Sequence, residues 1–145
     1  EERRSNWLHE IIEFPCVLIH AETKKKVNEF HAFVRPTENP KLSKFCTKLT
    51  GITQKQVDAA DTLDIVLQKF ERWLYQNSLL TKDGSVFFVP ATDGPWDIEC
   101  FLAKECARKS FNFPKYMREW VDVRHYFAER KGLSRRKNIK CTLQS

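Results

Sequence analysis

The sequence predicts an α/β domain with a mixed β-sheet that is flanked by helices. Three observations lead to this prediction. Two apolar segments with strand-like patterns lie near the start of the chain, at residues 10–20 and 27–35. Residues 62–76 have the apolar spacing of a helix, and residues 85–92 are again apolar. Strands and helices in this order favour a sheet with both parallel and antiparallel neighbours.

The first two segments have the patterns of strands that are joined in a hairpin. Residues 10–20 form a nearly continuous apolar run, which predicts a strand buried on both faces. In residues 27–35, apolar Phe30 and Val34 alternate with polar neighbours, which is typical of a half-buried strand. The polar turn at residues 22–26 therefore predicts an antiparallel pair.

Short helices are expected in the next part of the chain. A helix over residues 42–49 begins either at a cap provided by Ser43 or directly after Pro40. A second helix over residues 54–59 follows Thr53, whose hydroxyl is a favourable N-cap.

The clearest helical pattern covers residues 62–76. Its apolar side chains follow the spacing of one buried face, and they are Leu63, Val66, Leu67, Phe70, Trp73 and Leu74. Asp61 is predicted to cap this helix. Further along, residues 85–92 are predicted to form a strand, and residues 96–109 and 114–130 are predicted to form helices.

The composition is that of a basic globular domain. Of the 145 residues, 41% are hydrophobic and 30% are charged, and the formal net charge is +6. This charge suits a polyanionic partner such as nucleic acid, although a basic surface without such a partner explains it equally well. The five cysteines contain no Cys-x-x-Cys pair, which favours free thiols over a zinc site. No apolar run reaches membrane-spanning length, so no membrane partner is expected.

Asp97 is the first candidate functional residue. It follows a predicted strand and the turn at residues 93–95, and it lies in the first turn of a predicted helix. Ligands bind at the carboxyl ends of strands in open α/β sheets, so a carboxylate there can hold a metal ion. The helix dipole also stabilises an acidic side chain at this position, which leaves a structural role open. Asp122 is expected to be a helix cap or an ion-pair partner.

Aromatic, apolar and basic residues are candidates for contacts with nucleic acid. Trp96 and Leu49 can stack on a base or wedge against it, and they can equally belong to the core. The basic tail, which includes Arg135, Arg136 and Lys137, can contact phosphates or form a solvated loop.

Four segments together resemble one protein family. They are EIIEFP at residues 10–15, FVRP at 33–36, FCTKLTGIT at 45–53 and TDGPWD at 92–97. Their order and intervals are similar to those of the Eri-type 3′–5′ exoribonucleases, and within that family to the enzymes that act on histone-mRNA 3′ ends. The family is a branch of the DEDDh exonucleases, which share the ribonuclease H-like fold. The combination is specific, and it covers nearly the whole chain.

The resemblance implies that the parent protein hydrolyses RNA 3′ ends by two-metal-ion catalysis. The family uses four acidic residues to hold Mg²⁺, for which Mn²⁺ can substitute, and a histidine as general base. Asp97 matches the metal-binding aspartate of the second motif and is expected to be catalytic. Leu49, Thr50 and Trp96 are expected near the terminal nucleotide. The implied partners are single-stranded RNA, RNA 3′ ends and RNA–protein complexes, in the cytoplasm, the nucleus or both.

Two motifs of the family have no counterpart in residues 1–145, so a partial exonuclease domain, incomplete at both ends, is expected. The first motif would precede Glu1, the last would follow Ser145, and a helix would begin near residues 141–143. Such a chain is expected to be inactive alone and marginally stable, because a missing strand exposes the edges of its neighbours. The alternative function is a non-catalytic RNA- or protein-binding module derived from the same fold.

Overall fold

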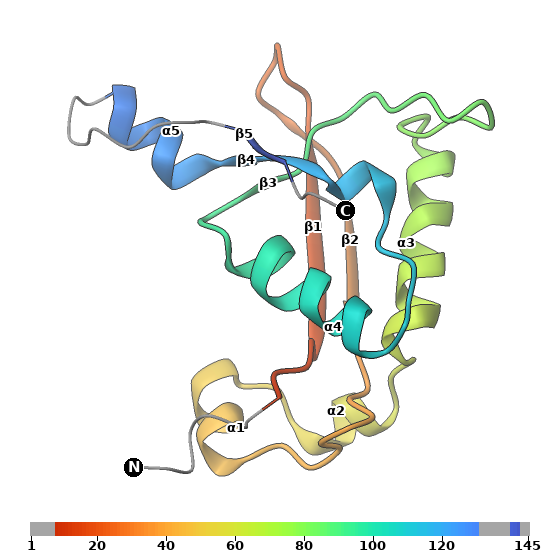
Figure 1. Ribbon diagram of the computed structural model, residues 1–145, viewed down its shortest axis with the longest axis vertical. Helices are drawn as coiled ribbons and strands as arrows, with labels where there is room; N and C mark the ends of the chain where they lie inside the picture. Colours follow the sequence, from red (N-terminus) through yellow and green to blue (C-terminus); the bar gives the residue numbers. More distant parts are fainter. Residues whose placement is uncertain (1–7, 131–139, 143–145) are drawn as a thin grey trace. The chain divides into compact units, whose positions relative to one another are not determined.

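The computed structural model describes residues 8–130 and 140–142 of the chain. Contacts divide the chain into two compact units, Glu1–Asn77 and Ser78–Ser145, here called the N-terminal unit and the C-terminal unit. The first contains a β-hairpin and helices, and the second contains a mixed sheet with helical segments (Figure 1). Within the described ranges, no helix is both long enough and apolar enough to span a bilayer.

The hairpin predicted near the start of the chain is confirmed. β1 (Glu13–Ile19) pairs antiparallel with β2 (Lys26–Phe33). Every second residue of β1 is exposed, so the prediction of a strand buried on both faces is wrong: Val17 is 53% exposed and Ile19 is 59% exposed. The reason is that helix packing covers only one face of the hairpin. This face carries Phe14, whose ring contacts the core.

Helix α1 (Lys44–Thr50) lies where the sequence predicts a short helix. Ser43 is its N-cap, and the Ser43 hydroxyl accepts a hydrogen bond from the backbone N–H of Cys46 at 3.0 Å. Gly51 ends the helix with φ at +74°, a conformation that costs glycine little because it lacks a side chain. None of the side chains of α1 is buried, so its position depends on the segments that flank it.

Helix α2 (Gln54–Asp58) begins at the N-cap that the sequence predicts. The Thr53 hydroxyl accepts a hydrogen bond from the backbone N–H of Gln56, and the Gln56 side chain accepts one from the backbone N–H of Thr53. These reciprocal bonds form a capping box, which satisfies two donors at the start of the helix. The fully buried side chain of Val57 anchors α2 in the core.

Helix α3 (Leu63–Gln76) provides most of the core of the N-terminal unit. Its buried residues are Leu63, Val66, Leu67, Phe70 and Leu74. The Phe70 side chain is 1% exposed, and its ring centroid lies 5.0 Å from that of Phe14 and 5.2 Å from that of Phe30. Aromatic contacts of this kind add to the stabilisation from buried apolar area. The Phe70 ring therefore joins α3 to both strands of the hairpin.

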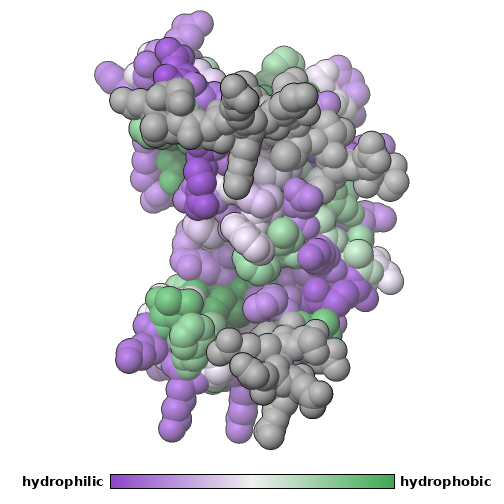
Figure 2. Space-filling model, turned by 60° about the vertical axis from the view of Figure 1, so that its left-hand side comes forward, coloured by the Kyte–Doolittle hydropathy of each residue, from purple (hydrophilic) through white to green (hydrophobic). Residues whose placement is uncertain are grey.

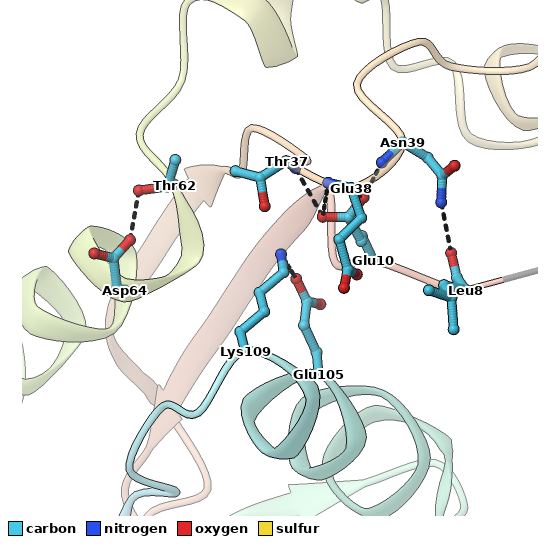
Figure 3. A network of polar contacts seen from close by, with 9 residues as sticks. All are labelled: Leu8, Glu10, Thr37, Glu38, Asn39, Thr62, Asp64, Glu105 and Lys109. Atoms are coloured by element: carbon cyan, nitrogen blue, oxygen red, sulfur yellow. Dashed lines mark hydrogen bonds and ion pairs between the residues drawn. The ribbon is translucent and has the colours of Figure 1, made fainter.

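Asp61 does not cap α3, so this prediction is wrong. Thr62 occupies the N-cap position, and its hydroxyl donates a hydrogen bond to the Asp64 carboxylate (Figure 3). Asp61 instead forms an ion pair with Lys69, and its carbonyl accepts a hydrogen bond from the backbone N–H of Arg35 at 2.8 Å. This hydrogen bond ties the backbone of Asp61 to the segment after β2. The helix therefore starts one residue later, with Thr62 as its N-cap.

A mixed sheet forms the centre of the C-terminal unit. The sequence predicts a mixed sheet, but of these three strands it locates only β3. β3 (Ala91–Thr92) pairs parallel with β4 (Glu119–Asp122), and β4 pairs antiparallel with β5 (Lys140–Thr142). The Trp120 side chain, in the middle strand, is completely buried. β5 lies where the resemblance implies the start of a helix, near residues 141–143. That expectation is wrong for Cys141 and Thr142, which pair with β4.

The strand predicted at residues 85–92 is confirmed only at its end. Ala91–Thr92 belongs to the sheet, while Val86 forms an isolated bridge. Phe87 and Val89 are 66% and 61% exposed. A strand requires a neighbour for its backbone groups, and along this part of the described chain only the last two residues have one in a sheet.

The helix predicted at residues 114–130 is replaced by three elements, and its middle is wrong. A 3₁₀ helix, η3 (Lys115–Met117), precedes β4, and α5 (Val123–Arg130) follows it. The helical spacing of Met117, Trp120 and Val121 suggested one continuous helix. Pairing with β3 and β5 prevails because large aromatic and β-branched side chains fit a sheet well.

Cys16, Cys46, Cys100 and Cys106 are free thiols, and of these four only Cys106 is fully buried. Burial raises the pKa of Cys16. Burial also raises the pKa of Cys106 to about 11, and the negative charge of Glu105 adds to this effect. Thiols with a raised pKa remain protonated at neutral pH, where they react slowly.

We expect the free energy of unfolding to depend on Cys106 above pH 9. The pKa of this thiol is about 11 in the folded chain, against an ordinary value of 9.0. Between these values the unfolded chain has released the proton and the folded chain has kept it. The contribution of Cys106 is therefore fully present below pH 9 and is lost as the pH rises through 11. Denaturant unfolding at several pH values measures the free energy of unfolding. Above pH 9 this free energy should fall more steeply with pH in the wild type than in Cys106→Ala. Equal slopes in the two proteins would refute the prediction.

Candidate active site

The carboxyl ends of β3 and β4 lie side by side in the C-terminal unit. The two strands run parallel, and Thr92 lies opposite Asp122. Asp93 and Asp97 follow β3 along the chain, so acidic residues gather at this edge of the sheet. This is the edge at which open α/β sheets bind their ligands.

A tight turn brings the chain from β3 into the next helix. Gly94, in this turn, has φ at +93°, and a Cβ built there would lie 3.5 Å from Trp96 Cδ1. A residue with a side chain would be strained in this conformation. The Thr92 hydroxyl donates a hydrogen bond to the Gly94 carbonyl at 2.8 Å, which fixes the turn. The helix can therefore begin two residues later, at Trp96.

The helix predicted at residues 96–109 is present, but its first part is a π-helix. η2 (Trp96–Leu102) leads directly into α4 (Ala103–Arg108). Pro95 lies at the N-cap, and its carbonyl accepts hydrogen bonds from the N–H groups of Glu99 and Cys100, four and five residues later. Such wide turns are frequent at functional sites. Buried Ile98 anchors the first turn, while the exposed residue Asp97 precedes it.

Asp97 differs from the other carboxylates at this edge because it has no partner in residues 8–130 and 140–142. Asp93 forms an ion pair with Arg124 at 2.9 Å, and this guanidinium lowers the pKa of Asp93. Asp122 accepts a hydrogen bond from the backbone N–H of His125 at 3.1 Å, so it caps α5, as the sequence predicts. The Asp97 carboxylate is thus available for a ligand.

Trp96 and Asp97 are adjacent at the start of η2. The Trp96 side chain is 56% exposed, and its ring centroid lies 6.5 Å from that of Phe101. It is not a core residue, which removes the structural alternative that the sequence left open. An exposed indole beside an unpartnered carboxylate can stack on a base while the carboxylate lies near a phosphate.

Leu49 and Thr50 belong to α1, in the N-terminal unit. The Leu49 side chain is 71% exposed, so it too lies outside the core. The Thr50 hydroxyl donates to the carbonyl of Cys46 at 2.8 Å and accepts from the N–H of Ile52 at 3.1 Å, so it stabilises the end of the helix. This contact was not evident from the sequence.

Phe45 is a candidate that sequence reasoning missed. Its side chain is 74% exposed, and it lies one helical turn before Leu49 on the same face of α1. The four-residue spacing of Phe45 and Leu49 was visible in the sequence, but the exposure of their side chains was not. Figure 2 shows apolar groups that reach the surface among hydrophilic ones on the drawn face.

Among Asp93, Asp97 and Asp122, only Asp97 lacks a partner in the described residues, and these residues form no complete metal site. In residues 8–130 and 140–142, no group of three or more His, Cys, Asp or Glu side chains is arranged to bind a metal ion. Asp97 fits the role of one oxygen ligand, which a hard divalent cation prefers. Arg135, Arg136 and Lys137, the predicted phosphate contacts, lie outside the described residues.

Comparison with known proteins assigns the chain to a protein family. The family model described as Exonuclease (RNase_T) matches residues 5–142. The human protein named 3′-5′ exoribonuclease 1 is 42% identical over 118 residues, which are 81% of this chain and 33% of the relative. The chain spans less than half the length of the curated relatives that it matches.

Solved structures have the same fold. The nuclease domain of 3′hExo, a DEDDh family member bound to rAMP, is 38% identical with a TM-score of 0.83, over 90% of this chain and 64% of that one. A 3′-exonuclease in 3′-end-specific recognition of a histone mRNA stem-loop is 38% identical with a TM-score of 0.84, over 93% of this chain and 46% of that one. The predicted ribonuclease H-like fold and the family resemblance are therefore confirmed.

Proposed function

The chain belongs to the exonuclease family, and we propose that the full-length protein hydrolyses RNA from its 3′ end. One observation carries this proposal: the exposed Asp97 carboxylate has no partner within the described residues and lies at the edge where open α/β sheets bind their ligands. The exoribonuclease name of the human relative supports RNA as the substrate, as do the rAMP and the histone mRNA stem-loop in the names of the solved relatives.

Asp97 is the residue that would hold a divalent metal ion. We take this ion to be Mg²⁺, with Mn²⁺ as a substitute, and we expect two ions in the complete site. Such ions stabilise charge on the reacting phosphate and lower the pKa of the attacking water. The other ligands would come from residues outside the described ranges. Asp97 itself is held in place by the turn around Gly94 and by the buried neighbour Ile98.

The exposed apolar side chains would contact the terminal nucleotides. Trp96 is next to Asp97, so its indole is placed to stack on a base close to the scissile phosphate. Leu49 and Phe45 offer a second apolar surface on α1, which ends at Thr50. The basic segment with Arg135, Arg136 and Lys137 would bind the RNA backbone, and such contacts weaken as salt is added; they are inferred from the sequence alone.

The direction of cleavage tests the proposed function. The full-length protein is incubated with 5′-labelled single-stranded RNA and Mg²⁺, in parallel with a circular RNA of the same sequence. We expect a ladder of products shortened from the 3′ end and an intact circle, because an exonuclease requires a free end. EDTA should abolish the ladder and excess Mg²⁺ should restore it, since the metal supplies charge stabilisation.

Other outcomes identify the alternatives. Cleavage of the circle would indicate an endonuclease and refute the proposal. RNA binding without cleavage in any divalent cation would favour the non-catalytic binding module. Undiminished cleavage in EDTA would remove the metal-binding role from Asp97.

A further inference from the structure

The Glu10 carboxylate is enclosed by the backbone of a loop that is distant in the sequence (Figure 3). Glu10 Oε2 accepts a hydrogen bond from the N–H of Thr37 at 2.7 Å, and Oε1 accepts one from the N–H of Asn39 at 2.6 Å. The N–H of Glu38 lies 3.0 Å and 3.1 Å from the two oxygens. Successive backbone N–H groups that point at one anion form a concave binding site, here filled by a side chain of the same chain.

Two further contacts fasten the same loop. The Asn39 side chain donates a hydrogen bond to the carbonyl of Leu8 at 3.3 Å (Figure 3). On the other side, Gln54 accepts a hydrogen bond from the N–H of Leu42 and donates one to the carbonyl of Pro40, both at 2.8 Å. Polar side chains therefore hold the loop at residues 37–42 from both ends.

This loop leads directly into α1, which begins two residues after Leu42. α1 buries none of its side chains fully, and only Cys46 and Thr47 are half-buried, so core packing holds its orientation only weakly. The chain before the helix is held by Glu10 and Gln54, and the chain after it enters the core at Ile52, which is 5% exposed. The placement of α1 therefore depends on a polar anchor at its start and an apolar anchor at its end.

We propose that Glu10 is a positioning residue, whose carboxylate holds the loop before α1 and so sets Phe45 and Leu49 for contact with RNA. The inference rests on the proposed function. A carboxylate suits this role because it only accepts hydrogen bonds, and bonds from N–H groups to a charged acceptor are stronger than neutral ones. A glutamine would direct an NH₂ group at the same backbone N–H donors, so Glu10→Gln weakens the anchor without changing its size.

The test compares Glu10→Gln with the wild type in the full-length protein. We expect KM for single-stranded RNA to rise about tenfold while kcat changes little, because Glu10 touches no reacting atom. Amide hydrogen exchange should accelerate in the loop and in α1 but not in α3. The control is Glu22→Gln, which removes the same charge from the exposed hairpin turn and should leave KM unchanged.

The outcomes separate this inference from the proposed function. An unchanged KM, or a loss in kcat alone, overturns the inference and leaves the proposed function in place. If the wild type cleaves no RNA, the proposed function fails, and fluorescence anisotropy with labelled RNA then tests the anchor. Weaker binding by Glu10→Gln supports it, while equal binding, or no binding by the wild type, overturns it.

Discussion

Replacing Asp97 with asparagine is expected to slow RNA cleavage by the full-length protein about 10²–10³-fold, the usual scale for losing one group that stabilises charge in a transition state. Asparagine keeps the size of the side chain but removes the charge that would hold a divalent ion. Because Asp97 is exposed and has no partner in the described part of the chain, the fold should be unaffected. Initial rates on 5′-labelled RNA give the effect, and circular dichroism checks the fold.

Glu99→Gln is the matched control for this experiment. Glu99 is also an exposed acidic residue in the first turn of η2, two positions after Asp97. Its neutralisation removes the same charge from the same turn, so any general effect of charge on RNA binding should be shared. We expect its rate to stay close to that of the wild type. Equal losses in the two variants would show that position 97 has no special role.

Replacing Phe70 with alanine is expected to lower the free energy of unfolding by about 3–5 kcal/mol. The Phe70 side chain is 1% exposed, and its ring contacts Phe14, Phe30 and Trp73. The variant loses the transfer free energy of a large side chain and leaves a cavity between α3 and the hairpin. Since domains are stable by only about 5–15 kcal/mol, the effect should be large in denaturant unfolding.

Tyr75→Ala provides the comparison for the Phe70 variant. Tyr75 lies in the same helix, and its side chain is 43% exposed. The Tyr75→Ala substitution removes an aromatic ring of similar size without opening a cavity in the core. The free energy of unfolding is therefore expected to change by less than about 1 kcal/mol. If both variants unfolded at the same denaturant concentration, the aromatic cluster would not be the main support of the hairpin.

Local patterns predicted the N-terminal unit well. The apolar spacing of residues 62–76 matches the buried face of α3, apart from the half-buried Trp73. The caps at Ser43 and Thr53 were also predictable, because a capping side chain bonds to backbone only a few residues away. Such features depend on residues that are close in the sequence, so a single sequence is enough to predict them.

Features that depend on distant partners could not be predicted. The apolar residues from Val86 to Val89 suggested a strand, but strand formation requires a neighbour that the pattern does not specify. Trp120 fits both a helical and a strand spacing, and pairing with β3 and β5 decides between them. The anchor at Glu10 joins residues 27 to 29 positions apart, and no local rule connects them.

The candidate site was predicted in part. The position of Asp97 after a strand and a turn was visible in the sequence, and the structure agrees. The π-helical turn was not, because it depends on which N–H groups bond to the Pro95 carbonyl. The availability of the carboxylate was also hidden, because the sequence does not show that Asp93 pairs with Arg124 while Asp97 has no partner in the described residues.

The most direct test is the metal preference of an Asp97→Cys variant of the full-length protein. A thiolate is a softer ligand than a carboxylate and favours Mn²⁺ over Mg²⁺. If Asp97 holds a metal ion, RNA cleavage by Asp97→Cys should be nearly absent in Mg²⁺ and partly restored in Mn²⁺. The rate in Mn²⁺ divided by the rate in Mg²⁺ should be about tenfold or more higher for Asp97→Cys than for the wild type or Asp97→Asn. The same ratio in all three proteins would contradict a metal-binding role for Asp97.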